Sequence, residues 1–287
     1  MAKLDINGTR IELIDQGSGD PVLFVHGSAS DYRTWRSPLD DLGNRYRAIA
    51  YSRRYHWPND RIPDDVDYSM AEHVDDLAAL LDSVAAGPVH LVGHSYGAFV
   101  AVLLANRQPQ RVRTLVLAEP PVVTLFVSNR PRLSELLRLL FHRPRTAAAI
   151  MRFGSTGIGP ATAAARRGDL DEAMRIFGTA VLGAEFYQRL STARLEQVRA
   201  NSIKAEFLGS GFPPLEDEAL RRLRVPTLLV SGQRSPSLFH RLLDRLEELL
   251  PHTERVEIPG GSHIMHEDNA VAYNAAVRSF LAAHEAA

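Results

Sequence analysis

Ser95 stands between two glycines in the segment Gly93-His94-Ser95-Tyr96-Gly97, at the joint between two apolar runs. The run before it, 89–92, is short and typical of a buried strand, and the alanine-rich run after it, 98–101, is typical of a helix. Glycine on both sides permits a sharp, strained turn that lifts the Ser95 hydroxyl above a sheet. The spacing therefore predicts a nucleophile, because a serine so placed can attack once a base has taken its proton.

The same turn would place the backbone N–H of Tyr96 at the start of a helix. Free donors and the helix dipole favour negative charge there. Attack by a serine creates an oxyanion, which fixed donors must stabilise. Because Ser95 could also serve as a plain helix cap, the rest of the chain must supply a base, an acid and a second oxyanion donor.

The best base follows the last predicted strand, in Gly260-Gly261-Ser262-His263-Ile264-Met265-His266. A glycine-rich loop at that position can bring an imidazole over Ser95. Where a serine nucleophile lies at a strand-to-helix turn, it precedes its histidine along the chain, as Ser95 precedes His263. We choose His263 because it directly follows the turn, with His266 as the alternative. The chain has eleven histidines, so a solvated surface histidine is the competing interpretation.

Composition bounds the kind of protein that carries these residues. The chain has 287 residues, of which 45% are hydrophobic, enough for one large α/β domain with an insertion. With a net charge of −1, the chain lacks the excess of basic residues that would attract nucleic acid or an acidic membrane. The absence of cysteine excludes disulfides, thiolate metal sites and cysteine nucleophiles.

No apolar run is long enough to span a bilayer, and the first residues lack the apolar core of a signal peptide. We therefore expect a soluble cytoplasmic protein, monomeric or homodimeric, whose partner is a small-molecule substrate. No grouping of His, Asp and Glu has convincing ligand spacing, so we expect no metal and no cofactor.

Apolar runs and helical patterns alternate along both ends of the chain, which predicts a doubly wound, mostly parallel sheet. The part at 123–215 has no convincing buried strand and predicts a helical cap inserted after the sixth strand, between core segments 1–122 and 216–287. Strands are expected at 3–6, 9–15, 22–25, 46–51, 89–92, 112–118, 225–230 and 255–258. Helices are expected at 31–42, 69–85, 96–107, 133–140, 161–167, 170–181, 185–198, 236–250 and 270–283.

Taken together, these motifs resemble the α/β-hydrolase fold superfamily over essentially the whole chain. The resemblance rests on the His26-Gly27 loop, the segment around Ser95 and the Gly260-to-His263 loop. It implies that the backbone N–H groups of Ser28 and Tyr96 form the oxyanion hole. His26 would then shape the loop in a structural role.

The acid departs from the common pattern of that superfamily, because Ser235 falls where its carboxylate is usually found. The other site known in the fold follows the preceding strand, as in the haloalkane-dehalogenase-like branch, and here that strand ends in Glu119. A histidine base needs an anionic partner, so we predict that Glu119 fills this role, with Asp31 or Glu267 as alternatives. An ion pair of Glu119 with Arg53 or Arg54 is the structural interpretation.

A serine nucleophile separates this chain from the dehalogenases and epoxide hydrolases of the fold, which use aspartate at the turn. It predicts an acyl-enzyme formed from a carboxylic ester, lactone or thioester of a small to medium apolar substrate. Two other functions stay open: a carbon–carbon bond hydrolase or lyase that uses the same three residues, and a non-enzymatic receptor for a small ligand.

Aromatic side chains are candidates for the substrate-binding wall, although aromatic residues at helical spacing are more often plain core. Arg53 and Arg54 follow a strand at the catalytic edge and could bind a substrate carboxylate; the favoured interpretation is an ion pair or a solvated loop. The predicted wall residues are Trp57, Phe99, Phe126, Phe177 and Tyr187.

Overall fold

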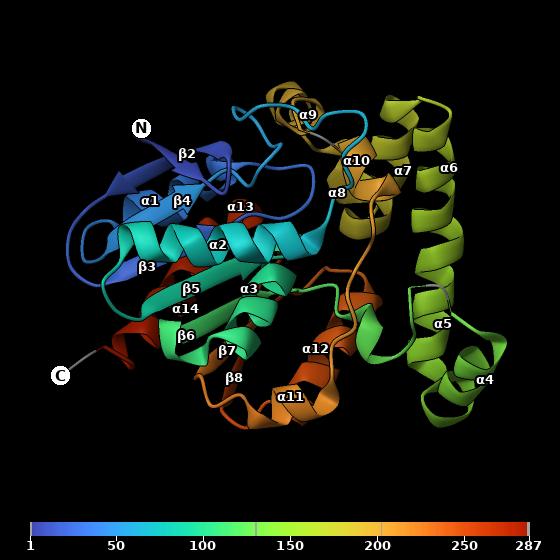
Figure 1. The fold of residues 1–287 in the computed structure, drawn as a ribbon. Helices are drawn as coiled ribbons and strands as arrows, with labels where there is room; N and C mark the ends of the chain where they lie inside the picture. Colours follow the sequence, from blue (N-terminus) through green and yellow to red (C-terminus); the bar gives the residue numbers. More distant parts are fainter. Residues whose placement is uncertain (1, 130, 202, 286–287) are drawn as a thin grey trace.

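The structure is a computed structural model that describes residues 2–129, 131–201 and 203–285. An eight-stranded sheet in the order β1-β2-β4-β3-β5-β6-β7-β8 runs through it (Figure 1). β2 pairs antiparallel with β1 and β4, and every other neighbouring pair is parallel. The strands are β1 (Ala2–Ile6), β2 (Thr9–Gln16), β3 (Pro21–Val25), β4 (Arg47–Tyr51), β5 (Val89–His94), β6 (Val112–Ala118), β7 (Thr227–Gly232) and β8 (Thr253–Ile258).

This order confirms the predicted α/β fold and its mostly parallel sheet. β1 and β2, which correspond to the strands predicted at 3–6 and 9–15, form a hairpin, and its turn residues Asn7 and Gly8 have φ values of 46° and 75°. Positive φ at both positions is what a two-residue hairpin turn requires.

Helices cover both faces of the sheet, so its central strands are buried on both sides; every residue of β5 is buried. One face packs against α2 (Met70–Val84), α3 (Tyr96–Arg107) and α12 (Ser237–Leu249) through a large apolar cluster. The other face packs against α1 (Arg36–Leu42) and α14 (Ala270–Ala282) through a second apolar cluster, which includes Trp35 and Tyr273. Figure 1 shows α2 and α3 in front of the sheet and α1 and α14 behind it.

The described residues between β6 and β7 contain helices and no strand (Figure 1). We call residues 123–215 the cap, although its division from the core stays a prediction. The described helices of this part are α4 (Leu133–His142), α5 (Pro144–Phe153), α6 (Gly159–Arg166), α7 (Leu170–Leu182), α8 (Ala184–Gln188), α9 (Thr192–Arg199) and α10 (Ile203–Leu208), with a 3₁₀ turn at Val123–Leu125 and a π-helical turn at Gly154–Ile158.

Details of the cap differ from the sequence prediction. The helix expected at 185–198 is two helices, because Ser191 begins α9 by accepting a hydrogen bond from the Arg194 N–H. α5 and α10 were not predicted, and neither was α11 (Asp217–Arg222), which lies between the cap and β7. In the core, the helix expected at 31–42 begins as a 3₁₀ turn at Tyr32–Trp35.

The carboxyl ends of the parallel strands meet at one edge of the sheet, the edge where ligands bind in open α/β folds. Ser95 follows β5 and Glu119 follows β6, while His263 lies between β8 and the short helix α13 (Met265–Asp268). Within the residues that the structure describes, no helix is long and apolar enough to cross a membrane.

Candidate active site

Ser95 occupies a strained turn between β5 and α3. Its φ is 50° and its ψ is −120°, a conformation that costs a non-glycine residue about 1–3 kcal/mol. The Ser95 N–H donates to the carbonyl of Ala118 at 2.8 Å, which ties the turn to the end of β6. A Cβ on Gly97 would collide with the carbonyl oxygen of Val25, so the turn can pack against β3 only with glycine there.

His263 and Glu119 meet beside this turn. Glu119 Oε2 lies 2.5 Å from His263 Nδ1, and the Gly232 N–H donates to Glu119 Oε1 at 2.8 Å. Both side chains are buried, with Glu119 0% and His263 3% exposed. Because the carboxylate holds Nδ1–H, the imidazole presents Nε2 as an acceptor, which is the tautomer that a general base needs.

Burial controls the ionisation of this pair. It raises the pKa of Glu119 to about 8 and lowers the pKa of His263 to about 3, because the charged form of each group loses its hydration. The hydrogen bond from the Gly232 N–H stabilises the carboxylate and so lowers the pKa of Glu119, which offsets part of the effect of burial. Since the two groups share a hydrogen bond, they titrate as a pair, and burial favours the state in which the pair has no net charge.

Two further side chains hold the imidazole in place. The ring of Phe239, from α12, stacks on His263 with centroids 4.0 Å apart and an interplanar angle of 21°. His94, the residue before Ser95, places Nε2 2.7 Å from the His263 carbonyl oxygen. A carbonyl only accepts, so this His94 nitrogen carries the proton.

The two predicted oxyanion donors are free of internal acceptors. Across the described ranges, neither the Ser28 N–H nor the Tyr96 N–H donates a hydrogen bond within the protein. Tyr96 begins α3, where an N–H has no partner inside the helix. His26 has the predicted structural role, because its Nε2 accepts the Arg53 N–H at 2.9 Å.

A cavity under the cap opens onto Ser95 in two arms, which meet at Ser28, Ser95, Phe177, Val181 and Ile203. The histidine arm, about 110 Å³, is the arm lined by His263 and His94. The tyrosine arm, about 370 Å³, is lined by Tyr68 and Tyr96 with Phe153, Phe212 and Phe239. Ser95 and His263 therefore face one space, although no hydrogen bond joins them among the described residues, as is common in unliganded sites.

The predicted wall residues divide into two groups. Phe177 lines both arms and Tyr187 lines the histidine arm. Trp57, Phe99 and Phe126 line neither arm in the described structure. Trp57 packs under the Arg33 guanidinium, Phe99 lies in the core behind Phe212, and Phe126 packs in the cap.

The alternative site residues have other partners. His266 Nε2 lies 2.8 Å from the Thr34 hydroxyl, under the ring of Trp35, and outside both arms. Asp31 binds Arg33 and Glu267 binds Arg194, so neither carboxylate contacts His263.

Arg53 and Arg54 form ion pairs, as the favoured interpretation expects. Arg54 binds Asp76 and Glu72 of α2. Arg53 binds Glu206 of the cap at 2.9 Å. Neither arginine lines the cavity among the described residues.

Sequence reasoning missed Phe239, Tyr68 and Glu206. Phe239 lies in a predicted helix, but nothing in its spacing marks it as a neighbour of His263. Glu206 belongs to α10, where no element was predicted, and it reaches the site only through the packing of cap on core. The described chain has no group of three or more metal-ligating side chains.

Comparison with known proteins places this geometry in a family. The family model described as "Alpha/beta hydrolase family" matches residues 22–276. A 2-(acetamidomethylene)succinate hydrolase of Mesorhizobium japonicum is 27% identical over 283 residues, which are 97% of this chain and 94% of that protein. A 2-hydroxymuconate semialdehyde hydrolase of a Pseudomonas species is 32% identical over 46% of this chain and 50% of its own length.

Solved structures show the same fold at low identity. A thermophilic esterase from Thermogutta terrifontis superposes with a TM-score of 0.69 and 22% identity, covering 99% of each chain. An epoxide hydrolase from Bacillus megaterium superposes with a TM-score of 0.74 and 18% identity, covering 98% of this chain and all of its own. The strand order, the strained serine turn and the family match agree, and the chain belongs to the alpha/beta hydrolase family.

Proposed function

We propose that this protein is a serine hydrolase that cleaves a carboxylic ester, or the related lactone or thioester, of a small to medium apolar substrate through an acyl-enzyme. One observation carries the proposal: the buried 2.5 Å contact between Glu119 and His263, whose ring lines the same cavity as Ser95. The contact leaves the second imidazole nitrogen as the only basic atom of the pair that can serve the Ser95 hydroxyl.

The chemistry then follows in two halves. His263 Nε2 takes the Ser95 proton while Oγ attacks the substrate carbonyl, and the oxyanion is held by the Ser28 and Tyr96 N–H groups. The tetrahedral intermediate collapses, the leaving group takes the proton from His263, and Ser95 remains acylated. Water, deprotonated by His263, repeats the sequence and releases the acid.

The two arms suit the two parts of such a substrate. His263 donates its proton to the leaving group, so the leaving group belongs in the histidine arm. That arm is walled mainly by apolar side chains, including Met174, Val181 and Leu182. The acyl part belongs in the tyrosine arm, beside Tyr96 and the aromatic rings of Phe153 and Phe212. A wall that is mainly apolar favours an apolar substrate.

A carbon–carbon bond hydrolase on the same three residues is the second candidate. It is favoured by the similarity to the 2-hydroxymuconate semialdehyde hydrolase, which spans about half of each chain. The two functions are separated by comparing kcat/KM for p-nitrophenyl esters with kcat/KM for 2-hydroxymuconate semialdehyde. A higher value for the semialdehyde replaces the ester proposal with the second candidate.

The proposal is tested with short p-nitrophenyl esters and the variant Ser95→Ala. We expect the wild-type protein to release p-nitrophenol with an initial burst, and the variant to lose essentially all of this activity. A serine-directed phosphonate should label Ser95 alone, as peptide mass spectrometry can show. Absence of turnover and of labelling in the wild-type protein would instead indicate a ligand receptor.

A further inference from the structure

A buried ion pair joins the cap to the core close to the oxyanion hole. Arg53 follows β4 and Glu206 belongs to α10, and their side chains are 0% and 5% exposed. Arg53 Nη2 lies 2.9 Å from Glu206 Oε1. Burying two charges loses their hydration, so such a pair adds little stability compared with apolar residues and calls for another explanation.

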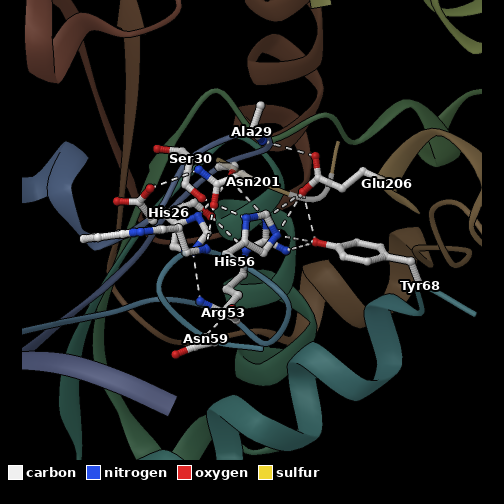
Figure 2. Close-up of polar contacts among 12 residues, drawn as sticks. His26, Ala29, Ser30, Arg53, His56, Asn59, Tyr68, Asn201 and Glu206 are labelled. Atoms are coloured by element: carbon white, nitrogen blue, oxygen red, sulfur yellow. Dashed lines mark hydrogen bonds and ion pairs between the residues drawn. The ribbon is translucent and has the colours of Figure 1, made fainter. Parts of the chain in front are cut away.

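The pair binds the backbone on both sides of Ser28. Arg53 donates from Nη2 to the carbonyl of Gly27 at 3.0 Å and from Nε to the carbonyl of His26 at 3.2 Å. Glu206 Oε2 accepts the N–H of Ala29 at 3.2 Å. Figure 2 shows Glu206 reaching Ala29 from one side while Arg53 lies beneath the loop. The residue held between these contacts carries one of the two proposed oxyanion donors.

The loop needs this support because its backbone is strained. Ala29 has a φ of 48°, in the left-handed region that alanine rarely adopts. The hydrogen bond from its N–H to Glu206 holds that conformation. The Arg53 guanidinium also lies 4.4 Å from the ring centroid of Tyr96, the residue with the second proposed donor. The ion pair therefore contacts the backbone on both sides of Ser28 and the side chain of Tyr96, the two residues that carry the proposed donors.

The network around the pair fixes its own geometry. The Tyr68 hydroxyl lies 2.6 Å from Arg53 Nη1, 2.9 Å from Glu206 Oε1 and 2.8 Å from His56 Nε2 (Figure 2). Burial raises the pKa of Glu206, but His56 and Arg53 outweigh that effect and hold it at about 2. The carboxylate is therefore charged at neutral pH.

We propose that Arg53 and Glu206 are positioning residues that couple the docked cap to the oxyanion hole. Arg53 holds the carbonyl side of the Ser28 peptide and Glu206 holds the following N–H, so that the Ser28 N–H points at the developing oxyanion only while α10 is seated on the core. This inference rests on the proposed serine hydrolase function, because it assigns the pair to the same reaction.

Glu206→Gln tests the coupling. The amide keeps the volume of the carboxylate, but one of its two oxygens becomes an NH₂ group, so it cannot accept from both Arg53 and Ala29. Loss of an oxyanion donor lowers kcat by about 10²–10³-fold. A donor that is only misplaced should lower kcat for p-nitrophenyl acetate about 10- to 100-fold, with KM within about threefold of wild type.

A second readout separates positioning from loss of stability. A trifluoromethyl ketone forms an adduct with Ser95 that carries the oxyanion, so its Ki should rise by about the same factor as kcat falls. Glu206→Asp keeps the charge but is one methylene too short to reach both Arg53 and Ala29. It should show the same fall in kcat and keeps the test valid if Glu206→Gln does not fold.

The neighbouring pair of Arg54 and Asp76 offers a matched control. It is also largely buried, with side chains 9% and 1% exposed, and among the described residues no hydrogen bond joins it to residues 26–29. Asp76→Asn should lower the melting temperature about as much as Glu206→Gln while kcat stays near the wild-type value.

The outcomes are distinguishable from failure of the proposed function. If Ser95→Ala keeps its esterase activity, the serine mechanism itself is wrong. If Ser95 is required, the coupling is overturned by either of two results. One is a kcat for Glu206→Gln no lower than that of Asp76→Asn, and the other is a change confined to KM.

Discussion

Glu119→Gln is the substitution that most directly probes the proposed mechanism, because the structure predicts how the new amide would sit. The Gly232 N–H donates to Glu119 Oε1 and needs an acceptor in its place. The glutamine oxygen must therefore face Gly232, which turns the NH₂ group toward His263 Nδ1. An amide that donates to Nδ1 forces the imidazole proton onto Nε2. That is the tautomer that cannot accept the proton of Ser95.

The size of the effect follows from this tautomer change. In serine triads the same exchange of acid for amide lowers kcat by about 10⁴. The Glu119 carboxylate is fully buried, so water cannot replace it as an acceptor for Nδ1–H. We expect kcat for p-nitrophenyl acetate to fall by about 10³- to 10⁴-fold, equivalent to about 4–5.5 kcal/mol of transition-state stabilisation.

The assay compares kcat and KM of wild type, Glu119→Gln and the control Glu267→Gln. Glu267 is the other carboxylate close to the histidine loop, and it binds Arg194 and Thr34 rather than His263. The control should keep kcat within about threefold of wild type, while far-ultraviolet circular dichroism shows both variants folded. If Glu119→Gln keeps more than a tenth of the wild-type kcat, Glu119 is not the acid and the tautomer argument is wrong.

Two other predictions concern pH and packing. Because burial raises the pKa of Glu119 to about 8, the His263–Glu119 pair takes up a proton as the pH falls through that value. The kcat/KM of the wild-type protein should therefore rise with pH through about 8 and level off above about pH 9, and an equal rate at pH 6 and pH 9 would contradict this. Gly97→Ala should cost about 3 kcal/mol of unfolding free energy in urea titrations, because its Cβ would collide with the carbonyl oxygens of Val25 and His26. The control Gly87→Ala meets nothing within 4 Å and should be close to neutral.

Much of the core could be predicted from the sequence because its signals are local. A strand that is buried on both faces is a short continuous apolar run, and the turn at Asn7 and Gly8 is set by two adjacent residues. The prediction of Glu119 needed more than local signals. It followed from the resemblance to the α/β-hydrolase superfamily, in which the acid can follow the preceding strand, because Ser235 stands here in the usual place of the acid.

The cap and the walls of the cavity were less predictable, because they depend on how one layer packs on another. Phe99 and Phe177 both lie in helices rich in apolar residues, and no local pattern distinguishes the buried core residue from the one that lines the cavity. The partner of Arg53 is Glu206, separated from it by 153 positions. A contact of that kind depends on the docking of α10, an element too short for its periodicity to be seen in the sequence.

The three strained residues of the site show why its geometry could not be derived locally. Ala29, Ser95 and Glu119 all have positive φ, and only Ser95 has a sequence signal for it, the flanking glycines. Each is held by a hydrogen bond from its own N–H to a distant part of the chain. The acceptors are Glu206 Oε2 for Ala29, the carbonyl of Ala118 for Ser95 and the carbonyl of Val230 for Glu119. At about 1–3 kcal/mol each, the strain of these residues persists only where the surrounding fold opposes its relaxation. Ala29 is held from the cap and the other two residues from the sheet, so displacement of the cap would relax the backbone beside Ser28 first and leave Ser95 and Glu119 in place.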